Sequence, residues 1–537
     1  MKKSRRVPAS RLRAMLSDGQ EIAFLDVREE GVFSRGHAFW AVPAPFSHLE
    51  RRLGLLVPRL GTRIVLTDGD GGELARRAAE RVSAWGYEDV SMLEGGLQGW
   101  RAAGFVVFSG VHVPSKAFGE VIEHRDGTPS IDPAELLAWR AEGRPVVVLD
   151  SRPFEEFHRF SLPGGIDCPG AELVHRAFGL VDEATTIVVN CAGRTRSIIG
   201  AQSLINAGVP NRVVALRNGT GGWHLAGETL AHGSRAVAPL PTPEGLAQAI
   251  EASRRVAERF GVREIDAERL RALQREADRR TLYLFDVRTP EEYEAGHLPG
   301  SRHAPGGQLV QSTDFYAGTR GARIVLVDDN GVRARMTASW LRQMGWEEAC
   351  VLGGGLRAAG LALEKGPGPA ATLGGDGRPA CESVSVGELQ RLVDAGAAVV
   401  LDLASSLRYR MGHIPGAWFA VRARFGEAFA KLPPQGELVL ASDDGDFARL
   451  AAADAIAAAP GRKLRVLAGG TRAWAAAGLP LATGFERLAS EPDDVWYSPY
   501  DHDDLGKAMT EYLSWETGLV GQLEREGIVF PDFPARP

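Results

Sequence analysis

A single cysteine, Cys191, lies where a reactive side chain is expected. Residues Ile187 to Val189 are continuously apolar and β-branched, which predicts a buried parallel strand, and Ser197 to Ala207 has the pattern of a helix. Cys191 therefore falls in the loop between a strand and a helix N-terminus. The helix dipole and the loop N–H groups would converge on its sulfur and favour the thiolate. These residues predict a nucleophilic cysteine in an electropositive, partly exposed loop.

The loop after Cys191 carries groups suited to holding an anion. A tight turn at Gly193 would direct backbone N–H groups inward as a nest, and Arg194 and Arg196 add two guanidinium forks. Arg196 is the stronger candidate of the two because it closes the loop at the start of the helix. The candidate substrate-binding residues are Ala192, Gly193, Arg194, Thr195, Arg196 and Ser197.

The other three cysteines, Cys168, Cys350 and Cys381, are interpreted as inert packing residues. Four cysteines in a chain of 537 residues cannot form a disulfide framework, and their spacing offers no Cys-x-x-Cys pair for a metal. We therefore expect no metal site and no cofactor. This cysteine usage is typical of a reducing compartment, so we expect a cytoplasmic protein.

The composition of the chain argues against several classes of function. The chain is 44% hydrophobic and 24% charged, as globular proteins are, and its formal net charge of -6 gives no support for nucleic-acid binding. No stretch approaches the length of a membrane span, and the amino terminus lacks the apolar segment of a secretory signal. We therefore expect no nucleic-acid and no membrane partner. The residues do not decide the oligomeric state.

The elements that position Cys191 recur four times along the chain. In each copy an apolar strand ends in an aspartate, a turn follows, and then come a second apolar strand, a helix and a closing Gly-rich or Asn-Gly turn. The strand-end aspartates are Asp26, Asp150, Asp286 and Asp402. Strands that alternate with helices indicate a parallel sheet with helices on both faces, and ligands of such sheets bind beyond the carboxyl ends of the strands. Cys191 lies at that end in copy two.

The repeats divide the chain into four domains and a tail. The expected domains are residues 1–110, 125–235, 245–365 and 378–485, followed by a tail of residues 486–537. Segments rich in Gly, Pro or polar residues are interpreted as linkers at 109–128, 239–244 and 366–377. Residues 504–524 of the tail have helical character. The tail aromatics are expected to pack on a domain surface rather than to form a binding site: Trp496, Tyr497, Tyr500 and Trp515.

The ordered motifs resemble those of the rhodanese family of sulfurtransferases, up to the start of the tail. Asp-x-Arg follows a strand, as in Asp286-Val287-Arg288, then come Gly-His-x-Pro-Gly, the cysteine loop, and Gly-Gly-x-x-x-Trp. The resemblance implies an α/β fold of four tandem rhodanese-like domains. It also implies that a loop cysteine takes sulfane sulfur from thiosulfate or a related donor, becomes a persulfide, and passes the sulfur to a thiol or cyanide acceptor.

The chain departs from the family pattern at the cysteine position. Asp68, Asp328 and Ser442 stand there in copies one, three and four, so these copies are expected to be catalytically silent. Copy two has Phe160-Ser161 in place of the Gly-His pair, which removes that histidine from its site. We also expect Arg152 and Glu156, four residues apart, to form a structural ion pair.

Several alternatives stay open. Cysteine phosphatases of the cell-cycle type share this fold by family resemblance, but their loop has five residues between cysteine and arginine. Here four residues separate Cys191 from Arg196, which favours the sulfurtransferase form. Three silent copies out of four also fit a non-catalytic scaffold. Among donors, the doubly cationic loop favours thiosulfate, while 3-mercaptopyruvate and glutathione persulfide remain alternatives.

Overall fold

The computed structural model describes residues 5–358, 360, 362–368, 372–374 and 381–534, and it contains four parallel five-stranded sheets. The second sheet has the strand order β6-β10-β9-β7-β8, and the other three repeat this order. Within it, β7 pairs with β9 from Val146↔Thr186 to Asp150↔Asn190. The central strand therefore delivers Cys191 to the carboxyl edge of the sheet, as expected for a ligand site of this architecture.

The first two domains contain the following elements. Domain one has β1 (Arg5–Val7), α1 (Ala9–Met15), β2 (Ile22–Asp26), α2 (Glu30–Ser34), β3 (Val42–Pro43), η1 (Phe46–His48), α3 (Leu49–Leu56), β4 (Arg63–Thr67), α4 (Glu73–Ala84), β5 (Asp89–Leu93) and α5 (Gly96–Ala102). Domain two has β6 (Ser130–Ile131), α7 (Pro133–Ala141), β7 (Val146–Asp150), α8 (Phe154–Arg159), β8 (Ile166–Asp167), α9 (Glu172–Ala177), β9 (Thr186–Asn190), α10 (Thr195–Ala207), β10 (Val213–Leu216) and α11 (Gly219–Leu225).

The third and fourth domains repeat this plan. Domain three has β11 (Arg263–Ile265), α13 (Ala267–Arg275), β12 (Leu282–Asp286), α14 (Pro290–Ala295), β13 (Arg302–His303), α15 (Gly306–Gln311), α16 (Thr313–Tyr316), β14 (Arg323–Val327), α17 (Val332–Gln343), β15 (Ala349–Leu352) and α18 (Gly355–Ala358). Domain four has β16 (Ser383–Val384), α19 (Val386–Asp394), β17 (Ala398–Asp402), α20 (Ser406–Met411), β18 (Trp418–Phe419), η2 (Arg422–Arg424), α21 (Phe425–Lys431), β19 (Glu437–Ala441), α22 (Asp446–Ala458), β20 (Leu464–Leu467) and α23 (Gly470–Ala476).

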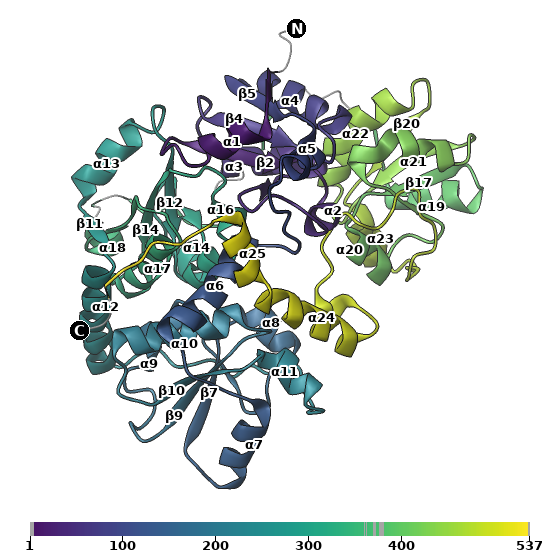
Figure 1. Cartoon of the computed structure of the whole chain (residues 1–537). Helices are drawn as coiled ribbons and strands as arrows, with labels where there is room; N and C mark the ends of the chain where they lie inside the picture. Colours follow the sequence, from purple (N-terminus) through teal and green to yellow (C-terminus); the bar gives the residue numbers. More distant parts are fainter. Residues whose placement is uncertain (1–4, 359, 361, 369–371, 375–380, 535–537) are drawn as a thin grey trace.

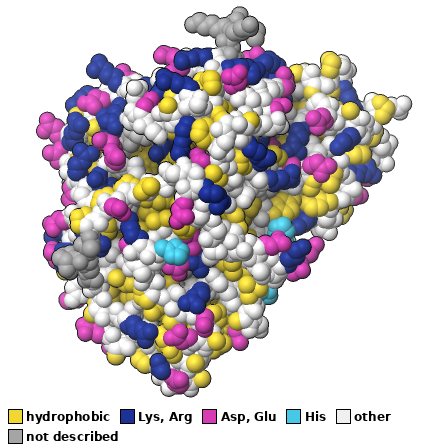
Figure 2. All heavy atoms as spheres, in the orientation of Figure 1, with side chains coloured by type: hydrophobic (Ala, Val, Ile, Leu, Met, Phe, Trp, Pro, Cys, Tyr) yellow, Lys and Arg dark blue, Asp and Glu magenta, His cyan; other side chains and the backbone are white. Residues whose placement is uncertain are grey.

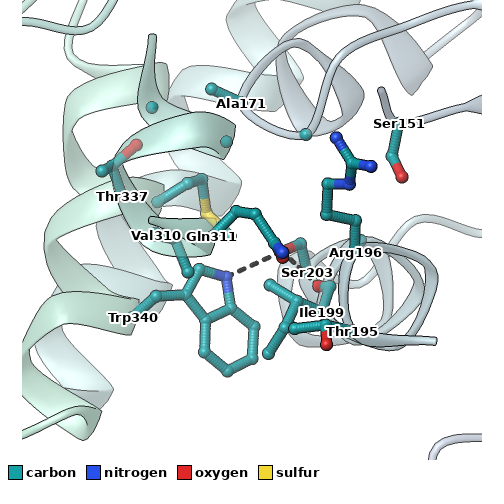
Figure 3. A pocket seen from close by; sticks show the side chains of 15 residues that line it. Ser151, Ala171, Thr195, Arg196, Ile199, Ser203, Val310, Gln311, Thr337 and Trp340 are labelled. Atoms are coloured by element: carbon teal, nitrogen blue, oxygen red, sulfur yellow. Dashed lines mark hydrogen bonds between the residues drawn. The ribbon is translucent and has the colours of Figure 1, made fainter. Parts of the chain in front are cut away.

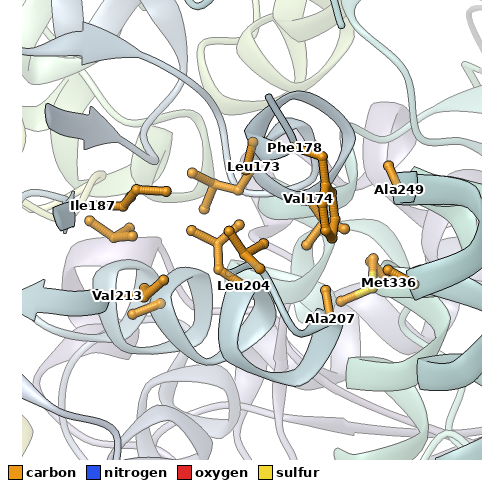
Figure 4. Close-up of a cluster of buried hydrophobic side chains, with 14 of the residues drawn as sticks. Leu173, Val174, Phe178, Ile187, Leu204, Ala207, Val213, Ala249 and Met336 are labelled. Carbon is orange, nitrogen blue, oxygen red and sulfur yellow. The ribbon is translucent and has the colours of Figure 1, made fainter. Parts of the chain in front are cut away.

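The core of domain two continues into domain three. Leu173, Ile187 and Leu204 pack in one buried cluster with Ala249 of α12 (Pro243–Arg259) and Met336 of α17 (Figure 4). Burying apolar side chains across the domain boundary stabilises the two domains against each other. Domain two is therefore supported by its neighbour on the side of α9 and α10.

The predicted linker 109–128 lies between the first two domains but is not irregular, because residues Val113–Asp126 form helix α6. Pro114 at its first turn and Gly127 beyond its end, at φ +63°, are ordinary helix boundary signals. The helix is buried on most sides, so its sequence lacks the amphipathic period that marks a surface helix. Gly119 lets α6 approach α10 closely, since a Cβ there would lie 2.8 Å from Thr195 Cγ2. The predicted linker 366–377 lies partly outside the described residues.

The tail crosses the molecule in Figure 1, from domain four past α6 towards α12. It contains η3 (Pro499–Asp501), α24 (Leu505–Thr517) and α25 (Leu519–Glu526), so its predicted helical character is confirmed. Leu519 and Leu523 of α25 join Phe118 of α6 and Trp340 of α17 in one buried cluster. The tail is thus packed among the domains.

The surface in Figure 2 mixes the two signs of charge, with Lys and Arg interspersed among Asp and Glu on the face shown. Among the described residues, no helix has the length and apolar character that crossing a bilayer requires.

Candidate active site

Cys191 follows β9 directly and precedes α10 by three residues, as the sequence pattern predicts. Its Sγ donates to Ser197 Oγ at 3.5 Å, and Ser197 Oγ in turn donates to the Arg194 carbonyl at 2.8 Å. The loop therefore curls back so that the first turn of α10 faces the sulfur. This arrangement brings Cys191, Ser197 and the backbone between them together.

The copies without the cysteine show which backbone groups face the residue at this position. In copy three, Asp328 occupies the cysteine position, and its carboxylate accepts from the N–H groups of Gly331 at 2.6 Å, Arg333 at 2.9 Å and Ala334 at 3.2 Å. In copy one, Asp68 accepts in the same way from Gly71 at 2.5 Å, from the loop N–H groups of Asp70 and Gly72, and from Ala75 N–H in the first turn of α4. The loop thus forms a nest that binds an anion.

The carboxylate in these copies stands in for a specific group. An aspartate Oδ lies as many bonds from the backbone as the outer sulfur of a cysteine persulfide would. The Asp328 carboxylate oxygens thus lie as far along their side chain as that outer sulfur would, and they accept from the N–H groups at this end of the sheet. Ala334 of copy three corresponds in position to Ser197 of copy two, the residue that already contacts Cys191.

Arg196 lies close enough to Cys191 to act on it electrostatically. Its positive charge opposes the burial that raises the pKa of the Cys191 thiol. Two guanidinium nitrogens bind the two Glu156 oxygens, each at 2.8 Å, and one also lies 3.4 Å from Gln308 of domain three. This bidentate pair fixes the guanidinium in place.

The expected Arg152–Glu156 ion pair is wrong, since Glu156 binds Arg196 instead. Arg152 forms two 2.8 Å bonds with Asp150, and a third bond of 2.7 Å runs to the Phe160 carbonyl. The same Asp-x-Arg pairing recurs between Arg288 and Asp286, and between Arg28 and Asp26. The motif therefore has a structural role, because it ties the end of a strand to the turn that follows α8 and its equivalents.

Arg194 is held away from Arg196 by helix α6. Its Nε and one terminal nitrogen each bind Glu120 at 2.8 Å, and the same nitrogen also binds Glu123. A further bond reaches Asn218 at 3.3 Å. Two carboxylates thus neutralise a guanidinium that the sequence alone leaves unpaired, so the loop is less cationic than its composition suggests.

The C-terminal tail closes the site, contrary to the prediction that its aromatics stay outside any binding site. Tyr500 Oη lies 2.6 Å from Thr220 Oγ1 and donates to the Ala192 carbonyl at 3.3 Å. From α24, Glu516 accepts from Thr195 Oγ1 at 3.3 Å and from Tyr512 Oη at 2.9 Å. The contacts of the tail with Ala192 and Thr195 span about 300 residues of sequence, so no local sequence pattern predicts them.

Lys116 of α6 is a further residue that sequence reasoning missed. It is 3% exposed, its Nζ donates to Tyr512 Oη, and it lies 3.8 Å from Glu516 Oε1. The rings of Trp496, Tyr512 and Trp515 surround the ammonium group at 4.4 to 5.5 Å. Such cation–π contacts partly replace lost solvation.

The expectation that Cys191 is partly exposed is wrong. Cys191 is 2% exposed, and its burial raises the pKa of the thiol, while Arg196 and Ser197 act in the opposite direction. Burial disfavours the charged form of a thiol. The cause is the tail, which covers the loop and also brings the negative charge of Glu516 near the sulfur.

The closing turn of each repeat contains a glycine because it packs directly against the residue at the cysteine position. Gly219 has φ +53°, and a Cβ at that position would lie 2.1 Å from the Cys191 carbonyl oxygen. Beside it, Thr220 N–H donates to the Cys191 carbonyl at 2.8 Å and Gly221 N–H to Ala192 at 3.0 Å. The equivalent glycines meet the carbonyl at the cysteine position in the same way: Gly96 on Asp68, Gly355 on Asp328 and Gly470 on Ser442.

A small cavity lies behind Arg196, between domains two and three. In Figure 3, Arg196 extends towards Ser151, and Trp340 Nε1 donates to Ser203 Oγ at 2.8 Å. Its volume of about 30 Å³ holds little more than one water molecule. Within the described residues, no cluster of His, Cys, Asp or Glu has the geometry to hold a metal ion.

Comparison with known proteins adds independent findings. The model of the rhodanese-like domain matches four times, at residues 8–103, 132–226, 266–360 and 385–477. The crystal structure of a thiosulfate sulfurtransferase from Pseudomonas aeruginosa superimposes with a TM-score of 0.92 at 46% identity, over 97% of this chain and 98% of that one. An uncharacterized protein of Bacillus subtilis (strain 168), YqhL, is 36% identical over 78 residues, which span 14% of this chain and 60% of that protein.

Proposed function

Because the chain belongs to the rhodanese-like domain family, we propose that it is a sulfurtransferase that moves sulfane sulfur from thiosulfate to a thiophilic acceptor through Cys191. The similar Pseudomonas aeruginosa protein, which is a thiosulfate sulfurtransferase, supports this activity over nearly the whole chain. The observation that carries the proposal is the loop of copy two. It lies at the same place in the repeat as the loops that hold Asp68 and Asp328, it has a cysteine in their position, and the backbone and hydroxyl of Ser197 contact that sulfur.

The proposed reaction has two displacements. The Cys191 thiolate attacks the outer sulfur of thiosulfate, the S–S bond of thiosulfate breaks, and sulfite leaves with its electron pair. The persulfide anion on Cys191 then rests against the loop N–H groups. A thiolate or cyanide attacks its outer sulfur, and Cys191 leaves as the thiolate. An aspartate or serine cannot form the persulfide, so Asp68, Asp328 and Ser442 leave their copies without this chemistry.

The experiment that tests this function is mass spectrometry of the protein after exposure to a donor. Thiosulfate should add the mass of one sulfur atom to the Cys191 peptide, and cyanide should remove it. Parallel reactions with 3-mercaptopyruvate and glutathione persulfide rank the alternative donors by rate. An unmodified Cys191 after all three donors would favour the non-catalytic scaffold, and hydrolysis of an aryl phosphate through Cys191 would favour the phosphatase alternative.

We expect Arg196→Lys to reduce kcat/KM for thiosulfate by about tenfold to a hundredfold, the value of a charge-assisted hydrogen bond. A lysine keeps the charge but loses the fork that binds Glu156 on one side and can orient a sulfonate on the other. Steady-state kinetics measure the change, with exposed Arg217→Lys in the same domain as the matched control. Arg194→Lys should cost less, because Glu120 and Glu123 already engage that guanidinium. Equal losses at both positions would contradict the ranking.

The silent copies are proposed to support domain two, within the proposed division at 1–110, 125–235, 245–365 and 378–485. Arg333 of copy three, which corresponds in position to Arg196, binds Glu292 of its own domain at 2.6 Å and Glu172 of domain two at 2.8 Å. A residue that follows the cysteine position of copy three thus stabilises domain two.

A cytoplasmic location is also proposed, since all four cysteines are free thiols.

A further inference from the structure

The Cys191 sulfur is covered by a segment that lies outside the four repeats, residues 499–517, here called the cover segment. It packs against glycines of the catalytic loop and closing turn: a Cβ at Gly221 would lie 2.4 Å from Met509 Sδ, and one at Gly193 would lie 3.1 Å from Glu516 Oε2. Tyr500 secures it through the Ala192 carbonyl. With Cys191 2% exposed, thiosulfate cannot reach the sulfur in this arrangement.

The cover segment is held over the loop by the buried side chains of Met509 and Leu513 and by polar contacts. Tyr500 bonds to Thr220, and Glu516 bonds to Thr195 and faces Lys116 across 3.8 Å. Hollows border the segment on two sides, one of about 470 Å³ lined by Tyr512 and one of about 620 Å³ lined by Tyr500. The segment therefore has space to move, and its polar contacts can be exchanged for water.

The contact between Glu516 and Lys116 also determines the net charge near the Cys191 sulfur. Glu516 is 1% exposed, and its Oε2 is a buried atom with no hydrogen-bond partner among the described residues. Lys116 is almost as buried and balances it. If the cover segment moves away, Glu516 leaves with it, whereas Lys116 stays on α6. The loop then faces an unpaired ammonium group, which attracts an anionic donor.

We propose that the cover segment is a movable wall of the active site, and that Glu516 and Lys116 are positioning residues that couple its opening to the charge state of Cys191. In the closed form the sulfur is shielded and its surroundings are neutralised. In the open form the sulfur is accessible and its surroundings are cationic. This inference deepens the proposed function, since it depends on Cys191 as the reacting group.

The sign of each charge effect follows from the groups around Cys191. Removal of the negative Glu516 should lower the pKa of the thiol, and removal of the positive Lys116 should raise it. Tyr500 carries no charge at neutral pH, so its loss should change access alone. The other charged groups around the site are Arg196 with Glu156, Arg152 with Asp150, and Arg194 with Glu120 and Glu123, and Tyr512 is a further titratable group.

The test is the rate at which iodoacetamide alkylates Cys191 in the full chain, followed by peptide mass spectrometry between pH 6 and pH 10 without any sulfur donor. We expect Glu516→Gln to move the midpoint of the rate profile down by about one pH unit and Lys116→Met to move it up. Tyr500→Phe should raise the plateau rate severalfold and leave the midpoint in place. Charge and access are thereby measured separately.

Matched controls lie on the same segment or beside it. Glu511→Gln and Lys507→Met change exposed residues of α24, and Tyr497→Phe removes a hydroxyl that bonds Ser406 of domain four. Two results together would overturn the proposal. The midpoint of the rate profile would move no further in Glu516→Gln than in Glu511→Gln, and the plateau rate would be unchanged in Tyr500→Phe. Because alkylation needs no sulfur transfer, this result is distinct from a failure of the proposed function. If Glu516→Gln does not fold, Tyr500→Phe alone decides the access claim.

Discussion

Replacement of Cys191 by serine is expected to reduce thiosulfate-dependent sulfur transfer to below about one thousandth of the wild-type rate. A serine hydroxyl fits the same loop, as Ser442 of copy four shows by accepting from Ala448 N–H at 3.2 Å. It cannot hold sulfane sulfur, so neither displacement can occur. The loss should therefore appear in kcat with an unchanged thermal unfolding midpoint.

The matched control is Cys381→Ser, which alters a half-buried thiol near the Leu464 carbonyl in domain four. Its sulfur-transfer rate should equal that of the wild type. Thiocyanate formation from thiosulfate and cyanide measures both variants. If Cys191→Ser kept a tenth of the activity, another group would have to carry the sulfur, and the assignment of copy two would be wrong.

The local part of the site could be predicted from the sequence because it depends on neighbours in the chain. A β-branched strand, a cysteine and a helix follow one another within about twenty residues, so Cys191 and Ser197 must meet. The four repeats could be recognised for the same reason. Each carries its own strands, turns and closing glycine, and Asp68, Asp328 and Ser442 show directly which copies lack the cysteine.

The rest of the site depends on contacts between distant segments. Lys116 lies on a helix whose burial on most sides erases its period, and Glu516 is one acidic residue among several in a helical tail. Nothing in the sequence around either residue indicates that it lies near Cys191. The sequence displays two arginines beside Cys191, but it does not show the burial that raises the pKa of this thiol, nor the approach of Glu516, which acts in the same direction.

The Gly219→Ala variant is expected to lose most sulfur transfer and about 2 to 5 kcal/mol of stability. A left-handed residue other than glycine costs about 1–2 kcal/mol, and forcing a methyl group into a packed site costs about 1–3 kcal/mol. Here the methyl group would lie 2.1 Å from the Cys191 carbonyl and 3.0 Å from that of Gly193. The loop must shift to relieve the clash, and a shifted loop no longer aims its N–H groups at the outer sulfur.

The steric origin of this effect can be isolated with Gly227→Ala in the same domain. Gly227 also has a positive φ, +84°, but in the described part of the chain no atom lies within 4 Å of its added Cβ. It should therefore incur only the backbone cost of about 1–2 kcal/mol and keep its activity. Urea unfolding and the thiocyanate assay measure both variants. Equal losses in the two would mean that backbone strain, and not contact with the cysteine loop, is why glycine is required at the closing turn.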